Sequence, residues 1–231
     1  AVGGKGYRQI DINLGCPFPM IAGKHKGAGM LLYPAQVAEV LAPIAEYPEI
    51  QFSLKMRLGW ENASECMVLV ELLNTLRLSR IALHARTGKQ QYKGHPDLEA
   101  FQGFYELCQH PLYYNGDIES LSDIRQILIR FPLLKGVFIG RGLLSSPLLA
   151  KEFKGNETFL PEQRMSIYFA FHEELFSAYS QVLQGETQLL VKMKTLWEYF
   201  LPETDRKLLK RIKKSTRLQQ YTESVKAIFT S

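Results

Sequence analysis

The stretch Gln51-Phe52-Ser53-Leu54-Lys55-Met56-Arg57-Leu58-Gly59 decides the fold of this 231-residue chain. Apolar residues over 51–56 predict a strand, and a polar, glycine-containing motif ends it. Similar strand-type runs occur at 8–13, 80–84, 112–115 and 136–139, and helix-type segments separate them at 35–45, 64–78, 97–108 and 120–131. Strands that alternate with helices in this way predict βαβ units and a parallel sheet. We therefore expect an α/β fold.

The pattern changes after Arg141. No strand-type run follows, and four amphipathic segments predict helices over 162–183, 186–200, 203–214 and 218–229. Gly185, Pro202 and Ser215-Thr216 separate these segments. We therefore expect two domains, an α/β catalytic domain over residues 1–155 and a small all-helical domain over residues 156–231.

Composition excludes several classes of protein. With 46% hydrophobic and 22% charged residues, the chain is neither disordered nor of low complexity. No apolar run approaches the roughly 18 residues of a membrane span, and the first residues lack the apolar stretch of a signal peptide. We therefore expect a cytoplasmic protein without membrane contact. The three cysteines, Cys16, Cys66 and Cys108, have spacings that fit neither a disulfide framework nor a metal site.

Positive charge is concentrated near the carboxyl end. Residues 192–231 carry a net charge of +6, whereas the preceding residues carry −1 and the whole chain +5. Leu208, Leu209 and Ile212 share one face of the helix predicted over 203–214. Six cations occupy its other faces, namely Arg206, Lys207, Lys210, Arg211, Lys213 and Lys214. A solvated helix surface is one explanation, but the concentration of charge favours contact with a polyanion.

Each predicted strand ends in a polar or glycine-rich motif. These motifs are Asn13-Leu14-Gly15-Cys16-Pro17, Lys55-Met56-Arg57-Leu58-Gly59, His84-Ala85-Arg86-Thr87, Asn115-Gly116-Asp117 and Gly140-Arg141-Gly142. In a barrel of parallel strands the carboxyl ends meet on one face, where such enzymes hold their active sites. The pattern therefore predicts an active site at this edge.

Taken singly, the motifs leave alternatives open. Asn115-Gly116-Asp117 is a common turn signal, and Gly140-Arg141-Gly142 fits either a tight turn or a phosphate site at a helix start. His84 fits a core histidine or, with Arg86-Thr87, a phosphate contact. A buried Lys55 needs an anionic or acceptor partner.

The cysteines differ in their surroundings. Cys66 and Cys108 lie in helical patterns and are typical of small core residues. Cys16 follows a strand in a Gly-Cys-Pro turn and fits a nucleophile, a metal ligand or an acid. A thiol with a reference pKa of about 8.5 is mostly protonated at neutral pH, which favours a general acid.

In order and spacing, the five motifs resemble the tRNA-dihydrouridine synthase family over residues 9–153, and the segment Lys24–Leu31 resembles the glycine-rich segment after the cysteine of that family. The resemblance implies a TIM-type (β/α)8 barrel that holds FMN, is reduced by NADPH and passes a hydride to C6 of a uracil in tRNA. It makes Cys16 the proton donor to C5. It further implies that Lys55 and His84 contact FMN, that Asn115, Gly116, Asp117, Gly140 and Arg141 hold its ribityl-phosphate end, and that Asn13 and Arg86 lie at the substrate.

The chain departs from the family at its start. Family members begin with an apolar strand that ends in Pro-Met, and their third strand carries a flavin-contacting glutamine, neither of which occurs here. By this count we expect strands four to eight only, without the first three βα units. The chain is then a portion of an FMN-dependent synthase, or a non-catalytic tRNA-binding remnant of one. Another FMN barrel, such as a dihydroorotate dehydrogenase relative, leaves the basic helical tail without a role.

The resemblance also sets expectations about assembly. It implies a tRNA partner, whose backbone contacts the helical domain of residues 156–231 and its six cations over 206–214. We also expect a monomer without a metal. The resemblance specifies neither the tRNA position that is reduced nor the NADPH site.

Overall fold

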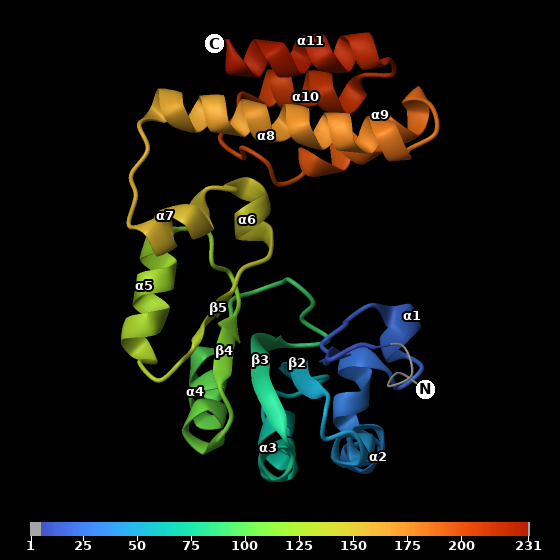
Figure 1. Ribbon diagram of the computed structural model, residues 1–231, viewed down its shortest axis with the longest axis vertical. Helices are drawn as coiled ribbons and strands as arrows, with labels where there is room; N and C mark the ends of the chain where they lie inside the picture. The colour runs from blue at the N-terminus through green and yellow to red at the C-terminus, as the bar shows by residue number, and fades with distance from the viewer. Residues whose placement is uncertain (1–5, 231) are drawn as a thin grey trace. The chain divides into compact units, whose positions relative to one another are not determined.

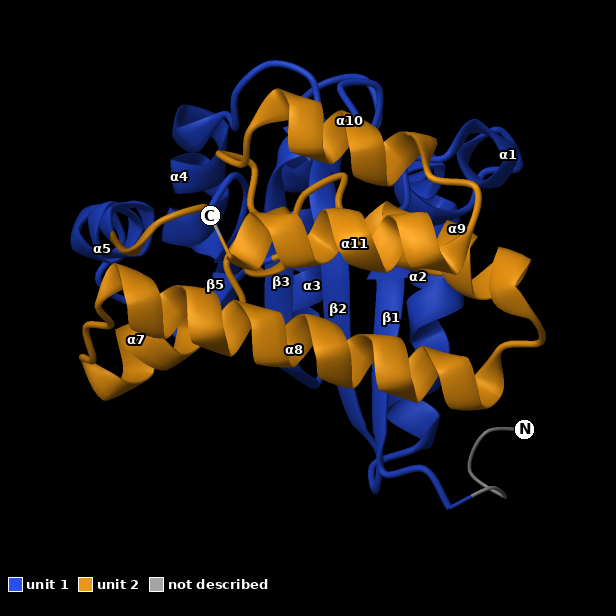
Figure 2. Ribbon diagram, turned by 90° about the horizontal axis from the view of Figure 1, so that it is seen from above, with its two compact units in different colours: residues 1–118, 122–139 blue, residues 119–121, 140–231 orange. Residues whose placement is uncertain are grey.

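The computed structural model describes residues 6–230. The chain divides into two compact units, which Figure 2 colours separately. The first unit comprises the described chain up to Ile118 together with Ser122–Ile139, and the second comprises Glu119–Leu121 and Gly140 onward.

The first unit alternates strands with helices. In chain order its elements are β1 (Gln9–Leu14), α1 (Pro19–Ala22), η2 (Gly27–Leu32), α2 (Pro34–Leu41), η3 (Ala42–Glu46), β2 (Gln51–Gly59), α3 (Glu65–Thr75), β3 (Leu78–Thr87), α4 (Leu98–Leu107), β4 (Leu112–Asn115), α5 (Leu121–Arg130) and β5 (Gly136–Phe138). Segments η2 and η3 are 3-10 helices. All five predicted strands are present.

The strands form one parallel sheet in the order β1-β2-β3-β4-β5, which confirms the α/β expectation. Strands β2 to β5 are labelled in Figure 1. Parallel strands joined in sequence by right-handed crossovers place their helices on one face of the sheet. Consistent with this rule, α3 packs against β2, α4 packs against β3, and α2, α3 and α4 are neighbours in chain order.

The core of the first unit lies between the sheet and these helices. Along β2 the side chains of Leu54, Met56 and Leu58 are at most 1% exposed, and they alternate with the polar residues that face the other way. Phe101 and Phe104 of α4 are fully buried. Burial of each such side chain stabilises the fold by roughly 1.5–3 kcal/mol.

Two strands are longer than predicted. β2 continues to Gly59 rather than ending at Met56, and β3 continues to Thr87 rather than ending at His84. The two extensions pair with each other, since Arg57 lies opposite His84 and Gly59 opposite Thr87. Charged residues near a strand end suggest a loop in sequence, but here the pairing between strands keeps them in the sheet.

Across its described residues, the second unit consists of helices joined by loops and has no strand. It contains α6 (Arg141–Ser145), α7 (Leu149–Gly155), α8 (Pro161–Val182), α9 (Glu186–Leu196), α10 (Arg206–Lys214) and α11 (Leu218–Phe229). The helices predicted after residue 160 are all present. The short helices α6 and α7 have no counterpart in the sequence-based expectation.

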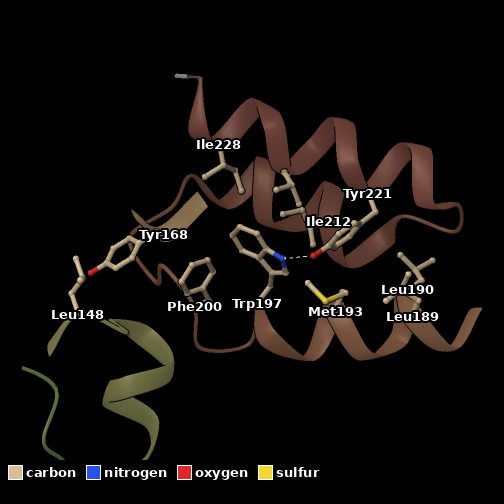
Figure 3. Close-up of a cluster of buried hydrophobic side chains, with 11 residues drawn as sticks. Leu148, Tyr168, Leu189, Leu190, Met193, Trp197, Phe200, Ile212, Tyr221 and Ile228 are labelled. Carbon is tan, nitrogen blue, oxygen red and sulfur yellow. Dashed lines mark hydrogen bonds between the residues drawn. The ribbon is translucent and has the colours of Figure 1, made fainter. Parts of the chain in front are cut away.

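The core of the second unit surrounds Trp197 and Tyr221 (Figure 3). The Trp197 Nε1–H group donates to Tyr221 Oη at 3.0 Å, and His172 Nε2 lies 2.6 Å from the same oxygen. Because the tyrosine oxygen already accepts a proton from tryptophan, its own hydroxyl donates to His172 Nε2. Burial lowers the pKa of His172, and the hydrogen bond that its ring donates to the Glu173 carboxylate opposes this shift. The three buried polar groups of Trp197, Tyr221 and His172 therefore satisfy one another's hydrogen-bonding capacity.

The two compact units divide before α6, earlier than the boundary predicted after residue 155. Helices α6 and α7 make their contacts with the helical unit. Ser146 Oγ lies 2.7 Å from Tyr168 Oη, Glu152 forms an ion pair with Arg164, and Leu148 belongs to the core in Figure 3. Sequence alone did not reveal these contacts, because α6 and α7 are too short to show a helical period.

Candidate active site

The strand register brings polar side chains of four strands together. Asn13 of β1 lies opposite Lys55 of β2, Arg57 of β2 lies opposite His84 of β3, and His84 lies opposite Asn115 of β4. Residues two apart in a strand share a face, so these side chains lie on one face near the carboxyl ends of the strands. The structure thus assembles the polar edge that the motifs predicted.

Lys55 is half-buried beside other charged groups. Burial is the main cause that lowers the pKa of its amine, the neighbouring Arg57 lowers it further, and Asp11 opposes both. Asp11 in turn accepts a hydrogen bond of 2.6 Å from Ser53 Oγ. An amine in these surroundings is stabilised by an electron-rich acceptor in contact with it.

His84 is neutral at physiological pH. Burial, followed by the charges of Arg57, Lys55 and Arg86, lowers its pKa to about 3. Arg86 Nη1 lies 3.4 Å from His84 Nε2. An arginine can only donate, so His84 Nε2 accepts and the ring proton resides on Nδ1. His84 therefore presents a neutral Nδ1–H donor.

Arg86 forms hydrogen bonds with both the turn after β4 and the loop after β3. Its two terminal nitrogens bind the two carboxylate oxygens of Asp117, and Nη1 does so at 2.8 Å. The other N–H groups donate to His84 Nε2 and to the carbonyls of Lys93 and Gly94. All five guanidinium protons are thus engaged within the described chain. To contact a substrate, as the sequence predicted, Arg86 must give up one of these bonds.

The loop that follows β4 needs glycine. Gly116 has a φ of +154°, and a Cβ there would lie 2.7 Å from Tyr114 Oη. The next residue, Asp117, has a φ of +32°. Asn115 Nδ2 donates to the Phe138 carbonyl at 2.8 Å and so ties β4 to β5. The side chains of Asn115 and Asp117 both bind protein groups here, while the turn is formed by the backbone.

Cys16 lies in the loop between β1 and α1, and hydrogen bonds fix this loop on both sides of the cysteine. Its thiol is free and half-buried. On one side, the Gly15 N–H group donates to Asn13 Oδ1 at 2.9 Å. On the other side, the Ala28 N–H group donates to the Cys16 carbonyl at 2.9 Å. Gly27, with a φ of +56°, packs so closely that a Cβ would lie 2.8 Å from that carbonyl oxygen.

Sequence reasoning gave Arg57 no role. Its side chain is 1% exposed, and its guanidinium donates to the carbonyls of Gly15, Thr87 and Gln91 at 3.1, 2.8 and 2.8 Å. The sequence does contain an indication of a role for Arg57, because a second charged residue follows Lys55 by two positions in a buried strand. Burial is the main cause that lowers the pKa of Arg57.

Two predicted residues belong to the other compact unit. Gly140 precedes α6 and Arg141 is its first residue. The remaining residues predicted at the cofactor and substrate, from Asn13 to Asp117, all lie in the first unit.

The six predicted RNA-binding cations all lie exposed on α10. The helix begins at Asp205, whose carboxylate accepts from the Lys207 and Leu208 N–H groups at 2.8 and 3.2 Å. The buried side chain of Ile212 anchors its apolar face. A groove of about 430 Å³ is lined by Lys207, Lys210, Arg211 and Lys214 with Ser215, Gln220, Glu223 and Ser224.

Residues 6–230 contain neither a metal-binding cluster nor a membrane-spanning helix. No cluster of three histidine, cysteine, aspartate or glutamate side chains there has a geometry able to hold a metal ion. No helix in this part of the chain is long and apolar enough to span a membrane.

Comparisons with known proteins agree with one another. A probable tRNA-dihydrouridine synthase of Aquifex aeolicus is 36% identical over 149 residues, covering 63% of this chain and 46% of the relative. A second such protein, from Rhizobium leguminosarum, is 32% identical over 139 residues, covering 60% of this chain and 44% of the relative. The tRNA-dihydrouridine synthase B of Vibrio vulnificus is 28% identical over 161 residues, covering 68% of this chain and 50% of the relative.

The chain spans about half the length of the curated relatives it matches. The family model described as "Dihydrouridine synthase (Dus)" matches residues 1–230. Since this match runs through almost the whole chain, the protein belongs to the dihydrouridine synthase family.

Proposed function

We propose that this chain is part of an FMN-dependent, NADPH-driven tRNA-dihydrouridine synthase that reduces the C5–C6 bond of a uridine in tRNA. The observation that carries the proposal is the Cys16 loop. A free, half-buried thiol is held from both sides, at the edge of the sheet where Asn13, Lys55 and His84 converge. The names of the relatives support the choice of reaction.

We also propose that the five-stranded sheet corresponds to strands four to eight of a TIM-type barrel. In support, the strands follow one another in sequence order, and each pairs in parallel with the next. Along β1 the alternating residues Gln9, Asp11 and Asn13 are exposed, whereas Leu14 is buried. Such alternation agrees with a barrel strand, along which residues that face the interior alternate with residues that face outward.

The donor set of the first unit fits FMN. The Lys55 amine and the neutral His84 ring offer donors to an electron-rich flavin ring, and the cations around them favour an anionic ligand. The turn at Gly116-Asp117 offers backbone donors, since the Asp117 carboxylate is bound by Arg86. We assign Asn115, Gly116 and Asp117, with Gly140 and Arg141, to the ribityl-phosphate end. When bound, FMN supplies the hydride, taken from NADPH, that adds to C6 of the uracil.

The chain itself then supplies a proton and an ordered pocket. The Cys16 S–H group donates its proton to C5, so that hydride and proton together saturate the C5–C6 bond. The resulting thiolate regains a proton from solvent. Asn13, next to the cysteine loop, is placed against the base, and Cys16 is held still by its neighbours during the transfer.

The helical unit is proposed to bind the tRNA backbone. Four of the predicted cations line one groove with hydrogen-bonding side chains, which suits a phosphodiester chain. A target base that is stacked in the tRNA must leave its stack to reach the thiol. We also propose a cytoplasmic location, in keeping with a tRNA substrate.

Flavin content and product formation test the proposal together. The purified chain is expected to show bound-flavin absorbance, or to take up added FMN, and to form dihydrouridine in an unmodified tRNA transcript when NADPH is present. Mass spectrometry of the digested transcript detects the added mass. A folded chain that binds tRNA, remains colourless with FMN and makes no dihydrouridine contradicts the catalytic proposal and favours the tRNA-binding remnant.

A further inference from the structure

Arg57 is as deeply buried as Arg86, since each arginine is 1% exposed. It lies in β2, and its guanidinium reaches two different loops while its side chain is only 1% exposed. Its Nε–H group donates to the Gly15 carbonyl, one residue before Cys16. Its Nη1 donates to the carbonyls of Thr87 and Gln91. One side chain therefore joins the cysteine loop to the loop that follows β3.

The loop after β3 is itself well anchored. The Gly88 and Lys89 N–H groups donate to the Gly59 and Trp60 carbonyls at 2.7 and 2.9 Å. Arg86 binds two further carbonyls of this loop. Arg57 thus connects the Cys16 loop to a segment that is fixed independently.

Both peptide groups that flank the Cys16 backbone are consequently held. Arg57 binds the Gly15 carbonyl, and the Ala28 N–H group binds the Cys16 carbonyl. The close packing of Gly27 leaves the Cys16 backbone little room to move. The thiol direction depends on the backbone between these two carbonyls, so the Arg57 bond bears on where the sulfur lies.

The guanidinium shape matters for this connection. Its donors form a planar fork, and here they satisfy three carbonyls that arrive from two directions. The Arg57 guanidinium carbon also lies 5.5 Å from the Tyr92 ring centre. A lysine would keep the charge, but its single nitrogen cannot span the same three acceptors.

We propose that Arg57 is a positioning residue that sets the orientation of the Cys16 thiol through the Gly15 carbonyl and couples the Cys16 loop to residues 87–94. The effect on turnover rests on the proposed function of Cys16 as the proton donor. The coupling of the two loops does not depend on that function.

Arg57→Lys tests this role, with Arg77→Lys, an exposed arginine of the same unit, as the matched control. In Arg57→Lys we expect Cys16 to react with iodoacetamide about tenfold faster, because its loop loosens. We expect kcat for dihydrouridine formation to fall about tenfold to 100-fold with an unchanged KM for tRNA, since the misplaced thiol acts only in the chemical step. Arg77→Lys should match the wild type in both measurements.

The outcomes separate the two proposals. Unchanged Cys16 alkylation in a folded Arg57→Lys variant overturns the positioning role. A changed alkylation rate in a protein whose wild type makes no dihydrouridine leaves Arg57 in its role and removes the proposed function. An equal loss of rate in Arg77→Lys would reveal general damage and would also overturn the inference.

A measurement on the wild type decides the matter if Arg57→Lys does not fold. The coupling requires the amides of segments 15–28 and 87–94 to become accessible to hydrogen exchange in one event, with the same urea dependence. Independent opening of the two segments contradicts the coupling.

Discussion

Arg86 and Asp117 form a two-point ion pair that joins the end of β3 to the turn after β4. The arginine side chain is 1% exposed and the aspartate side chain 30%. Removal of one partner from such a pair leaves the other charge buried without compensation. This pair and the Arg57 hydrogen bonds both join loops at the carboxyl ends of the strands.

We therefore expect Asp117→Asn to destabilise the first unit by about 3 kcal/mol, the cost typical of breaking a buried pair. Hydrogen exchange of β3 amides measures this loss. Glu99→Gln is the matched control, because it breaks an exposed pair with Arg130 and should cost less than about 1 kcal/mol. Equal effects of the two substitutions would contradict the structural role of the Arg86–Asp117 pair.

The stability of the first unit should decrease in mild acid because of His84. Its folded-state pKa is about 3, below the ordinary value of about 6.5 that applies when the chain is unfolded. Below pH 6.5 the unfolded chain therefore binds more protons than the folded chain, and stability is lost as the pH falls towards 3.

At pH 5 the expected loss is about 2 kcal/mol for this histidine. Urea unfolding at pH 7.5 and pH 5 measures the difference. His84→Gln should reduce it, whereas His95→Gln, which changes an exposed histidine, should not. A wild-type dependence that survives His84→Gln unchanged would assign the effect to other groups.

Tyr221 supports the core of the helical unit through its hydroxyl group. Tyr221→Phe removes both the acceptor of Trp197 and the donor to His172, and leaves their buried nitrogens unpaired. We expect a loss of about 1–3 kcal/mol. In a Trp60→Phe background, Trp197 alone reports unfolding by fluorescence, because the chain has 2 tryptophans. The exposed Tyr199→Phe should be neutral, and a neutral Tyr221→Phe would refute the importance of the network.

Cys16→Ala should separate flavin chemistry from product formation. The variant is expected to keep FMN and NADPH-dependent flavin reduction, and to lose dihydrouridine formation by about 100-fold or more, the upper part of the range for a general acid. Cys108→Ala, the other half-buried cysteine, should be fully active. A normal dihydrouridine yield in Cys16→Ala would remove this thiol from the mechanism.

The sequence predicted the elements better than their contacts. Period and turn residues located all five strands, because hydrophobic alternation is a local property. The contacts of Arg57 and Arg86 differ, and this difference does not depend on local sequence. Both arginines lie near the carboxyl end of a strand in similar motifs, yet the structure joins one to the cysteine loop and the other to Asp117. Such pairings depend on register between strands far apart in sequence, which no single motif encodes.

The groove beside α10 leads to a prediction about salt. If Lys207 and Lys210 each neutralise an RNA phosphate, the double variant Lys207→Gln/Lys210→Gln should bind tRNA more weakly, and the dependence of log Kd on log salt should lose about 0.7–0.9 per contact. The matched control is Lys154→Gln/Lys192→Gln, which removes the same charge from exposed positions elsewhere in the helical unit.

Titration of tRNA at several salt concentrations compares the two double variants. A uniform electrostatic attraction would make them equally weak, because it depends on net charge alone. A groove that binds phosphates directly instead predicts that only the α10 variant shows a weaker dependence of log Kd on log salt. Apolar residues fix which face of α10 is turned outward, since Ile212 is fully buried while Lys207 and Lys210 are exposed. Equal slopes in both variants would therefore assign tRNA binding to net charge rather than to the α10 groove.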